Sequence, residues 1–153
     1  MRALQLKIPP ALIALAFGAA MSAAAANLPA AAFHVPYARH VGAGTAVLGL
    51  AVVLLGMFTF MANKTTVDPH QPSRASALVT SGIYRATRNP MYLGFLLVLA
   101  GWALLAGNWI AVVLLPLFIV LLNKLQIEPE ERILEEHFGD AYRAYKARTR
   151  RWI

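Results

Sequence analysis

The sequence contains no cysteine and few charged residues, and only seven of its residues are acidic. Without cysteine, disulfide bonds, thiolate catalysis and cysteine-bound metal are excluded, and the redox compartment cannot be inferred. Charged residues make up 14% of the 153 residues, and 14 of them are Lys or Arg. Catalytic or binding chemistry must therefore come from His, Asp, Glu, Arg, Tyr and the backbone.

Hydrophobic residues make up 59% of the chain, and the mean hydropathy is +0.57. These values are typical of a membrane protein, and the length allows one compact unit. In a soluble protein, the net charge of +7 would favour a nucleic-acid partner. Basic residues that flank apolar spans instead follow the positive-inside rule and contact anionic lipid. We therefore predict membrane lipids around the chain and no nucleic-acid partner.

Three runs without charge organise the chain: residues 8–26, 41–62 and 91–123. The first run follows basic residues, as in a secretory signal. Its 19 residues exceed the roughly 7–15 of a signal core, so we expect a retained helix. The second run has a face of small residues for close helix contact, and association between copies through this face stays open. The small residues are Gly42, Ala46, Gly49 and Gly56.

The third run is 33 residues long, which is about 50 Å of helix against a hydrocarbon core of roughly 30 Å. Gly107 and Asn108 near its middle predict a turn that splits it into helices 91–106 and 109–124. Four crossings place 13 of the 14 Lys and Arg on one side, leaving Arg39 opposite, whereas three crossings divide them 6 against 8. We therefore predict an all-α membrane protein with about four transmembrane helices. Its C-terminal half contains a helical hairpin and then an amphipathic cytoplasmic helical segment that Gly139 interrupts.

All seven carboxylates fall on the side that carries the 13 cations. The predicted hairpin begins and ends on this side, so the loop before residue 91 and the residues after 124 come together. The loop and the start of the hairpin, residues 80–94, hold two arginines and two tyrosines beside the apolar run. Charge held at the edge of a bilayer is commonly functional. The sequence therefore predicts one polar site built from two distant segments.

Residues 78–84, 88–94 and 138–145, together with Glu130 and Glu131, resemble the isoprenylcysteine carboxyl methyltransferase family, which is related to the phospholipid N-methyltransferases. The matching segments lie within residues 65–153, and the two N-terminal helices match in character only. The resemblance implies S-adenosylmethionine as the cofactor and S-adenosylhomocysteine as the product. We expect a single membrane domain, 1–153. Two transmembrane helices occupy 1–63, and 64–153 hold the cofactor-binding loop, the hairpin and the C-terminal helices.

By this resemblance, the cofactor-binding residues are Ser76, Ala77, Leu78, Val79, Tyr84, Asn89, Pro90, Met91, Tyr92 and Glu130, and the catalytic candidates are Glu131, Arg88 and Gln126. The carboxylate of the cofactor suits Arg88 and the helix start near Pro90, whereas its ammonium and sulfonium suit carboxylates and tyrosine faces. Asn89 stands where eukaryotic members have His, and Gln126 stands where they have an Arg assigned to the substrate. A neutral amide cannot pair with a carboxylate as a guanidinium does, so Gln126 weakens the case for a carboxylate acceptor.

The resemblance makes methyl transfer to a lipid-like or prenylated acceptor the leading prediction, first as carboxyl O-methylation of an isoprenylcysteine-like substrate. Two alternatives stay open: a phospholipid or amine N-methyltransferase, and a non-catalytic membrane assembly protein. The four histidines lack metal-ligand spacing, so no metal is predicted. We expect an integral protein of the bacterial inner membrane with both termini and the active site in the cytoplasm. The oligomeric state stays open.

Overall fold

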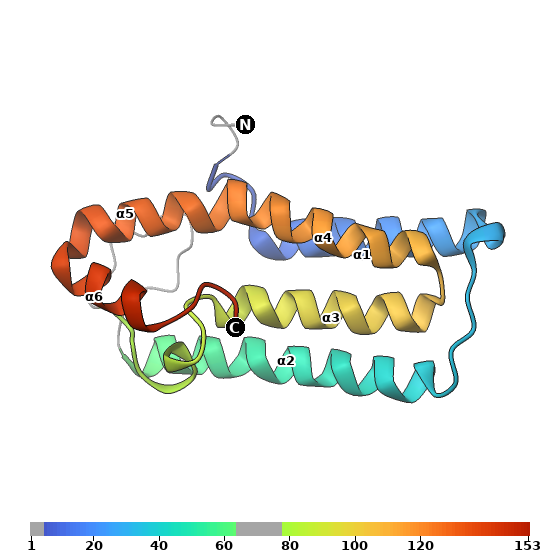
Figure 1. Ribbon diagram of the computed structural model, residues 1–153, viewed down its shortest axis with the longest axis horizontal. Coiled ribbons are helices and arrows are strands. Elements are labelled where there is room, and N and C mark those ends of the chain that lie inside the picture. The colour runs from blue at the N-terminus through green and yellow to red at the C-terminus, as the bar shows by residue number, and fades with distance from the viewer. Residues whose placement is uncertain (1–4, 64–77) are drawn as a thin grey trace.

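The protein is a bundle of helices, and the computed structural model describes residues 5–63 and 78–153 (Figure 1). The α-helices are α1 (Pro10–Asn27), α2 (Ala38–Ala62), α3 (Pro90–Ala106), α4 (Trp109–Leu122), α5 (Glu128–Phe138) and α6 (Asp140–Arg148). Shorter helical elements are the 3-10 turns η2 (Pro29–Ala31) and η4 (Gly82–Arg85) and the π-helical turn η5 (Asn123–Ile127). The described residues form no strand, so the all-α prediction is confirmed.

Figure 1 shows α1 to α4 with each helix antiparallel to the next, and α3 lies between α2 on one side and α1 and α4 on the other. The α1–α2 linker and the α3–α4 turn lie at one end of the bundle, which we call the far end. The beginnings of α1 and α3, the end of α2, and α5 and α6 lie at the opposite end, which we call the site end. The predicted hairpin is confirmed, because the residues before α3 and those after α4 meet at the site end.

Among the described residues, three helical segments are long and apolar enough to cross a membrane: Pro10–Asn27, Ala38–Ala62 and Trp109–Phe138. The apolar helix α3 is shorter, with 17 residues, or about 25 Å of helix. The third segment joins α4, η5 and α5 into one helix, because a π-helical turn inserts backbone without ending the helix. The uncharged part of this segment ends at Asn123, and the first turn of α5 carries three Glu residues, so α5 lies outside the part that spans the membrane. The C-terminal segment therefore continues the hairpin as far as Gly139, whose φ of 54° ends α5.

α2 and α3 pack along a row of glycines. Gly42, Gly49 and Gly56 are the buried residues of α2, and each lies against α3. A Cβ atom added at Gly49 would lie 2.7 Å from both the Gly94 carbonyl oxygen and the Val98 nitrogen. Such contacts require glycine, because the two backbones approach closely. The small-residue face is therefore confirmed, and α3 of the same chain covers it.

The turn between α3 and α4 is built by Gly107 and Asn108, as predicted. Gly107 adopts a left-handed conformation with φ of 58°, which glycine reaches without strain. The buried Asn108 accepts a hydrogen bond from the Ile110 nitrogen at 2.9 Å, which caps α4. Its Nδ2 donates to the Leu28 carbonyl at 3.1 Å, and the Phe33 nitrogen donates to the Gly107 carbonyl at 2.7 Å. The α1–α2 linker is thereby tied to the turn.

Helix α1 contributes to the core. Met21 is fully buried, and the ring of Phe17 meets that of Phe118 edge-on at 5.2 Å between centroids. Trp102 of α3 donates from its indole nitrogen to the Ser22 hydroxyl at 3.0 Å. These contacts make α1 a packed part of the bundle, which is what the expectation of a retained helix requires.

Candidate active site

The first turn of α5 carries three carboxylates in three different environments. Glu128 forms an exposed ion pair with Lys124, at 2.9 Å. Glu131 is buried and bonded to arginines. Glu130 accepts a hydrogen bond from the Tyr92 hydroxyl and forms no ion pair with any described residue. The three neighbouring acids are therefore not interchangeable.

Glu131 lies at the centre of an arginine clamp, formed by Arg88, Glu131 and Arg151. Its Oε1 accepts from Arg88 Nη2 at 2.7 Å, and its Oε2 accepts from Arg151 Nη2 at 2.6 Å. The side chains of Glu131 and Arg88 are only 7% and 9% exposed. Arg88 Nη1 also donates to the carbonyls of Lys146, at 3.2 Å, and Thr149. The clamp joins α5, the start of α3 and the end of α6.

The charge of the clamp favours ionised Glu131. Burial raises the pKa of its carboxyl, but hydrogen bonds and positive charge from Arg151 and Arg88 outweigh burial and hold the pKa below its ordinary value. A carboxylate shared by two guanidinium groups is a weak base. The geometry thus pairs two of the predicted catalytic residues, Arg88 and Glu131, with each other, and their catalytic roles stay predictions.

The C-terminal residues form a strap over the start of α3. The backbone nitrogen of Arg88 donates to the Arg150 carbonyl at 2.9 Å. The Arg151 carbonyl accepts from Asn89 Nδ2 at 3.0 Å and from the Thr87 hydroxyl at 3.2 Å. The Asn89 amide is therefore bonded within the chain, and its predicted cofactor contact stays a prediction. Sequence reasoning missed the strap, because these terminal residues have no periodic pattern and pair through backbone carbonyls.

Beside the clamp lies a second group, which we call the cradle: Tyr84, Tyr92 and Glu130. Tyr84 is buried in η4, its ring meets that of Phe60 at 5.3 Å, and its carbonyl accepts from the Tyr145 hydroxyl at 2.7 Å. The Tyr84 hydroxyl itself is buried and has no hydrogen-bond partner among the described residues. Within residues 5–63 and 78–153, the cradle thus contains a carboxyl without a cation and a hydroxyl without a hydrogen-bond partner. Buried polar groups left in this way commonly await a ligand or water.

Burial dominates the electrostatics of the cradle. It raises the pKa of Glu130 to about 8, the hydrogen bond from Tyr92 opposes this rise, and the negative charge of Glu131 adds to it. Burial also raises the pKa of the Tyr84 hydroxyl, and the charges of Tyr145 and Glu130 contribute to the rise. A carboxyl that is costly to ionise becomes a favourable site for a cation, because the cation removes that cost.

Gln126, the third predicted catalytic residue, forms no hydrogen bond with the clamp or the cradle within the described part of the chain. It is fully buried in η5, and its Nε2 donates to the Ile8 carbonyl at 2.7 Å. A carbonyl can only accept, so the amide nitrogen must face Ile8, and Oε1 is left without a partner among the described residues. Nearby, the Leu6 nitrogen donates to the Leu125 carbonyl at 3.0 Å. Gln126 therefore anchors the segment before α1 to the π-helical turn.

Four other predicted cofactor-binding residues are described by the structure: Leu78, Val79, Pro90 and Met91. Val79 is buried, and Leu78 is partly buried. Pro90 is the buried first residue of α3, and Met91 lies against Gly56 of α2. All four lie at the site end. Ser76 and Ala77 fall outside the described residues.

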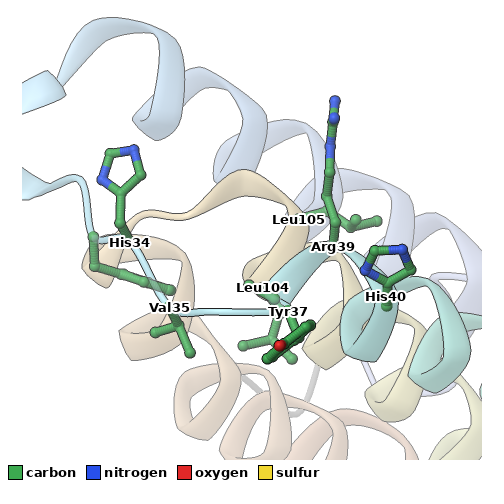
Figure 2. Close-up of a pocket in the computed structure, with 9 residues that line it drawn as sticks. His34, Val35, Tyr37, Arg39, His40, Leu104 and Leu105 are labelled. Carbon is green, nitrogen blue, oxygen red and sulfur yellow. The ribbon is translucent and has the colours of Figure 1, made fainter.

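A cavity of about 470 Å³ lies at the far end, between residues 33–40 and the end of α3 (Figure 2). It shares no residue with the clamp or the cradle. The candidate site at the site end is therefore supported by the chemistry of its side chains and not by the shape of this cavity.

Residues 38–141 match the phospholipid methyltransferase family. An uncharacterised protein of Haemophilus influenzae is 48% identical over 63 residues, 41% of this chain and all of that protein. The protein-S-isoprenylcysteine O-methyltransferase of Schizosaccharomyces pombe is 37% identical over 72 residues, 47% of this chain and 30% of that enzyme. The human enzyme of the same name is 33% identical over 110 residues, 67% of this chain and 39% of that enzyme. The chain thus spans well under half the length of these two enzymes. No solved structure matches.

Proposed function

Because this chain belongs to the phospholipid methyltransferase family and is similar to isoprenylcysteine O-methyltransferases, we propose that it transfers a methyl group from S-adenosylmethionine to a lipid-like acceptor at the membrane surface. S-Adenosylhomocysteine is the second product. The observation that carries the proposal is the cradle, in which Glu130 has no cation among the residues that the structure describes and lies beside tyrosines at the end of the bundle. We also propose that residues 1–153 act as one membrane domain.

The residues of the cradle fit the cationic groups of this cofactor. An ammonium or sulfonium is stabilised by a carboxylate and by aromatic faces, which Glu130, Tyr84 and Tyr92 offer. The unpartnered hydroxyl of Tyr84 offers one further hydrogen bond. Arg88 is engaged in the clamp, so the first turn of α3 is the better candidate for the carboxylate of the cofactor. Bound there, the cofactor would supply a methyl group activated by its sulfonium.

The clamp has a positioning role in this proposal. It holds the first turn of α5 against the start of α3, which keeps Glu130 beside Tyr92. The strap covers residues 87–89 and helps to exclude water from the start of α3. Methyl transfer depends chiefly on alignment of donor and acceptor in a site closed to water. We propose that Leu78 and Val79 also line this site.

Two classes of acceptor have support. The names of the relatives support carboxyl O-methylation of an isoprenylcysteine-like substrate. The family description supports the alternative, N-methylation of a phospholipid or amine. An apolar acceptor would reach the site end from the bilayer. We further propose that this end faces the cytoplasm of a bacterial inner membrane, because the basic residues gather there.

The test uses the full chain in lipid nanodiscs, titrated with S-adenosylmethionine and then supplied with methyl-labelled cofactor and a membrane lipid extract. Glu130→Gln should weaken cofactor binding about 10- to 100-fold, since bonds to charged groups contribute roughly 1.5–3 kcal/mol. Glu136→Gln, an exposed change in the same helix, is the control and should have no effect. Base-labile label indicates an ester, and base-stable label indicates methylated nitrogen. No saturable binding by the wild type would favour an assembly protein over an enzyme.

Cofactor affinity should also depend on pH through Glu130. Its pKa of about 8 means that the carboxyl is mostly protonated at neutral pH and must release a proton to pair with a cation. Affinity should therefore fall up to about tenfold for each pH unit below about 8, and this dependence should disappear in Glu130→Gln. Calorimetry in buffers of different ionisation enthalpy measures the released proton. Wild-type affinity that stays constant between about pH 6 and 8 would contradict the role of Glu130.

A further inference from the structure

The cavity at the far end is an open notch, which we call the far-end notch. It is lined by Phe33, His34, Val35, Tyr37, Ala38, Arg39, His40, Leu104 and Leu105 and has a volume of about 470 Å³. Residues 28–33 are tied to the α3–α4 turn by the bonds described above, so one side of the notch is held in place. The other side is the first turn of α2.

The charge of the notch has one sign. Arg39 is the only Lys or Arg between residues 28 and 62, and no Asp or Glu occurs between 28 and 62 or between 91 and 123. No hydrogen bond or ion pair joins the Arg39 side chain to another described residue. Figure 2 shows His34 and Arg39 extending in the same direction from separate parts of the lining. An exposed cation without a counter-charge attracts an anion.

The residues around the notch show that its ligand must also have an apolar part. Trp109 and Tyr37 are 58% and 78% exposed at this end, as aromatic residues at a membrane–water interface are. Val35, Leu104 and Leu105 line the notch, and the exposed apolar surface continues along α2 from Val41. A ligand that satisfies both features has an anionic head group and an apolar tail.

We propose that the far-end notch binds one anionic phospholipid of the leaflet at this end, with its phosphate at Arg39, flanked by His34 and His40, and an acyl chain against Leu104 and Leu105. A guanidinium matches the geometry of a phosphate through paired N–H donors. The site is independent of the methyl transfer proposed above, since the 17 residues of α3 separate the two ends by about 25 Å.

The full chain is tested by native mass spectrometry after extraction from vesicles with equal amounts of phosphatidylglycerol and phosphatidylcholine. We expect preferential retention of one phosphatidylglycerol. Arg39→Ala should lower its apparent affinity at least about tenfold, which corresponds to the loss of one charged contact. His34→Glu, which places a negative charge at the exposed rim, should weaken it as well. Arg85→Ala removes an exposed arginine at the site end and serves as the matched control.

The proposal would be overturned by equal retention of both lipids or by unchanged retention in Arg39→Ala. It would also be overturned if Arg85→Ala lowered the retention of phosphatidylglycerol as much as Arg39→Ala. Displacement of the lipid by inorganic phosphate at equal concentration would also overturn it, because a free anion would then suffice. Cofactor binding by Arg39→Ala should match that of the wild type. This readout separates failure of the lipid site from failure of the proposed methyl transfer.

Discussion

Glu131→Gln is expected to lower the free energy of unfolding by about 3–5 kcal/mol, because it leaves two guanidinium groups of a buried cluster without their negative partner. Arg88 and Glu131 are less than a tenth exposed, so water cannot replace the lost carboxylate. The same change should loosen the strap and the first turn of α5, and cofactor binding should fall with it. Denaturant titration of the full chain in detergent micelles measures the change in stability.

The control for this prediction is Glu136→Gln, which is exposed in the same helix and should change stability by less than about 0.5 kcal/mol. Arg151→Ala should cost less than Glu131→Gln, because the Arg151 side chain is 33% exposed and Arg88 keeps its partner. The wild type should lose stability in acid. The folded pKa of Glu131 lies below its unfolded value, so its stabilisation is present above the unfolded pKa and is lost as the pH falls through the folded pKa. Equal stability of Glu131→Gln and Glu136→Gln would contradict the importance of the clamp.

Gly49→Leu is expected to separate α2 from α3 and to destabilise the bundle by about 3 kcal/mol or more, since overpacking against backbone cannot be relieved by a rotamer change. A Cβ atom at this position would lie 2.7 Å from the Gly94 carbonyl oxygen and 2.9 Å from Val98 Cγ2. α3 carries Tyr92 and follows Arg88, so its displacement should also lower cofactor binding. Thermal unfolding of detergent-solubilised protein at fixed detergent concentration provides the measurement.

Gly44→Leu is the matched control, because it introduces the same side chain in the same helix and nothing lies within 4 Å of the added Cβ. Leucine favours helix over glycine by somewhat less than 1 kcal/mol, so this variant should be as stable as the wild type or slightly more stable. If both variants lose stability equally, the effect belongs to α2 itself and not to its contact with α3. A large loss in Gly49→Leu alone supports the close contact.

The sequence predicted the path of the chain at the site end well. A charge-free run too long for one crossing, with Gly107 and Asn108 at its middle, predicted a hairpin whose ends meet. Length and turn chemistry are local properties, so they could be deduced without coordinates. The sequence did not predict the strap, because Arg150 and Arg151 contribute backbone carbonyls, and every residue type has a carbonyl.

The site residues illustrate the same limit. The resemblance grouped Arg88, Glu131 and Gln126 as catalytic candidates, yet the tertiary structure joins Arg88 to Glu131 and ties Gln126 to Ile8. Their partners are distant in sequence, and a pattern of residue types does not state which side chains meet. The predicted cluster of Arg, Glu and Tyr is present, but its charges are divided between the clamp and the cradle.

The amino acids alone predict an all-helical membrane chain that doubles back and gathers its acids and nearly all its bases at one end. They suffice for this because hydropathy and charge are sums over residues, and turn preferences are local. Tertiary packing decided how the adjacent Glu130 and Glu131 are used. Consecutive residues on a helix point about 100° apart, so Glu131 meets two arginines, whereas Glu130 meets tyrosine and has no counter-charge in the part of the chain that the structure describes.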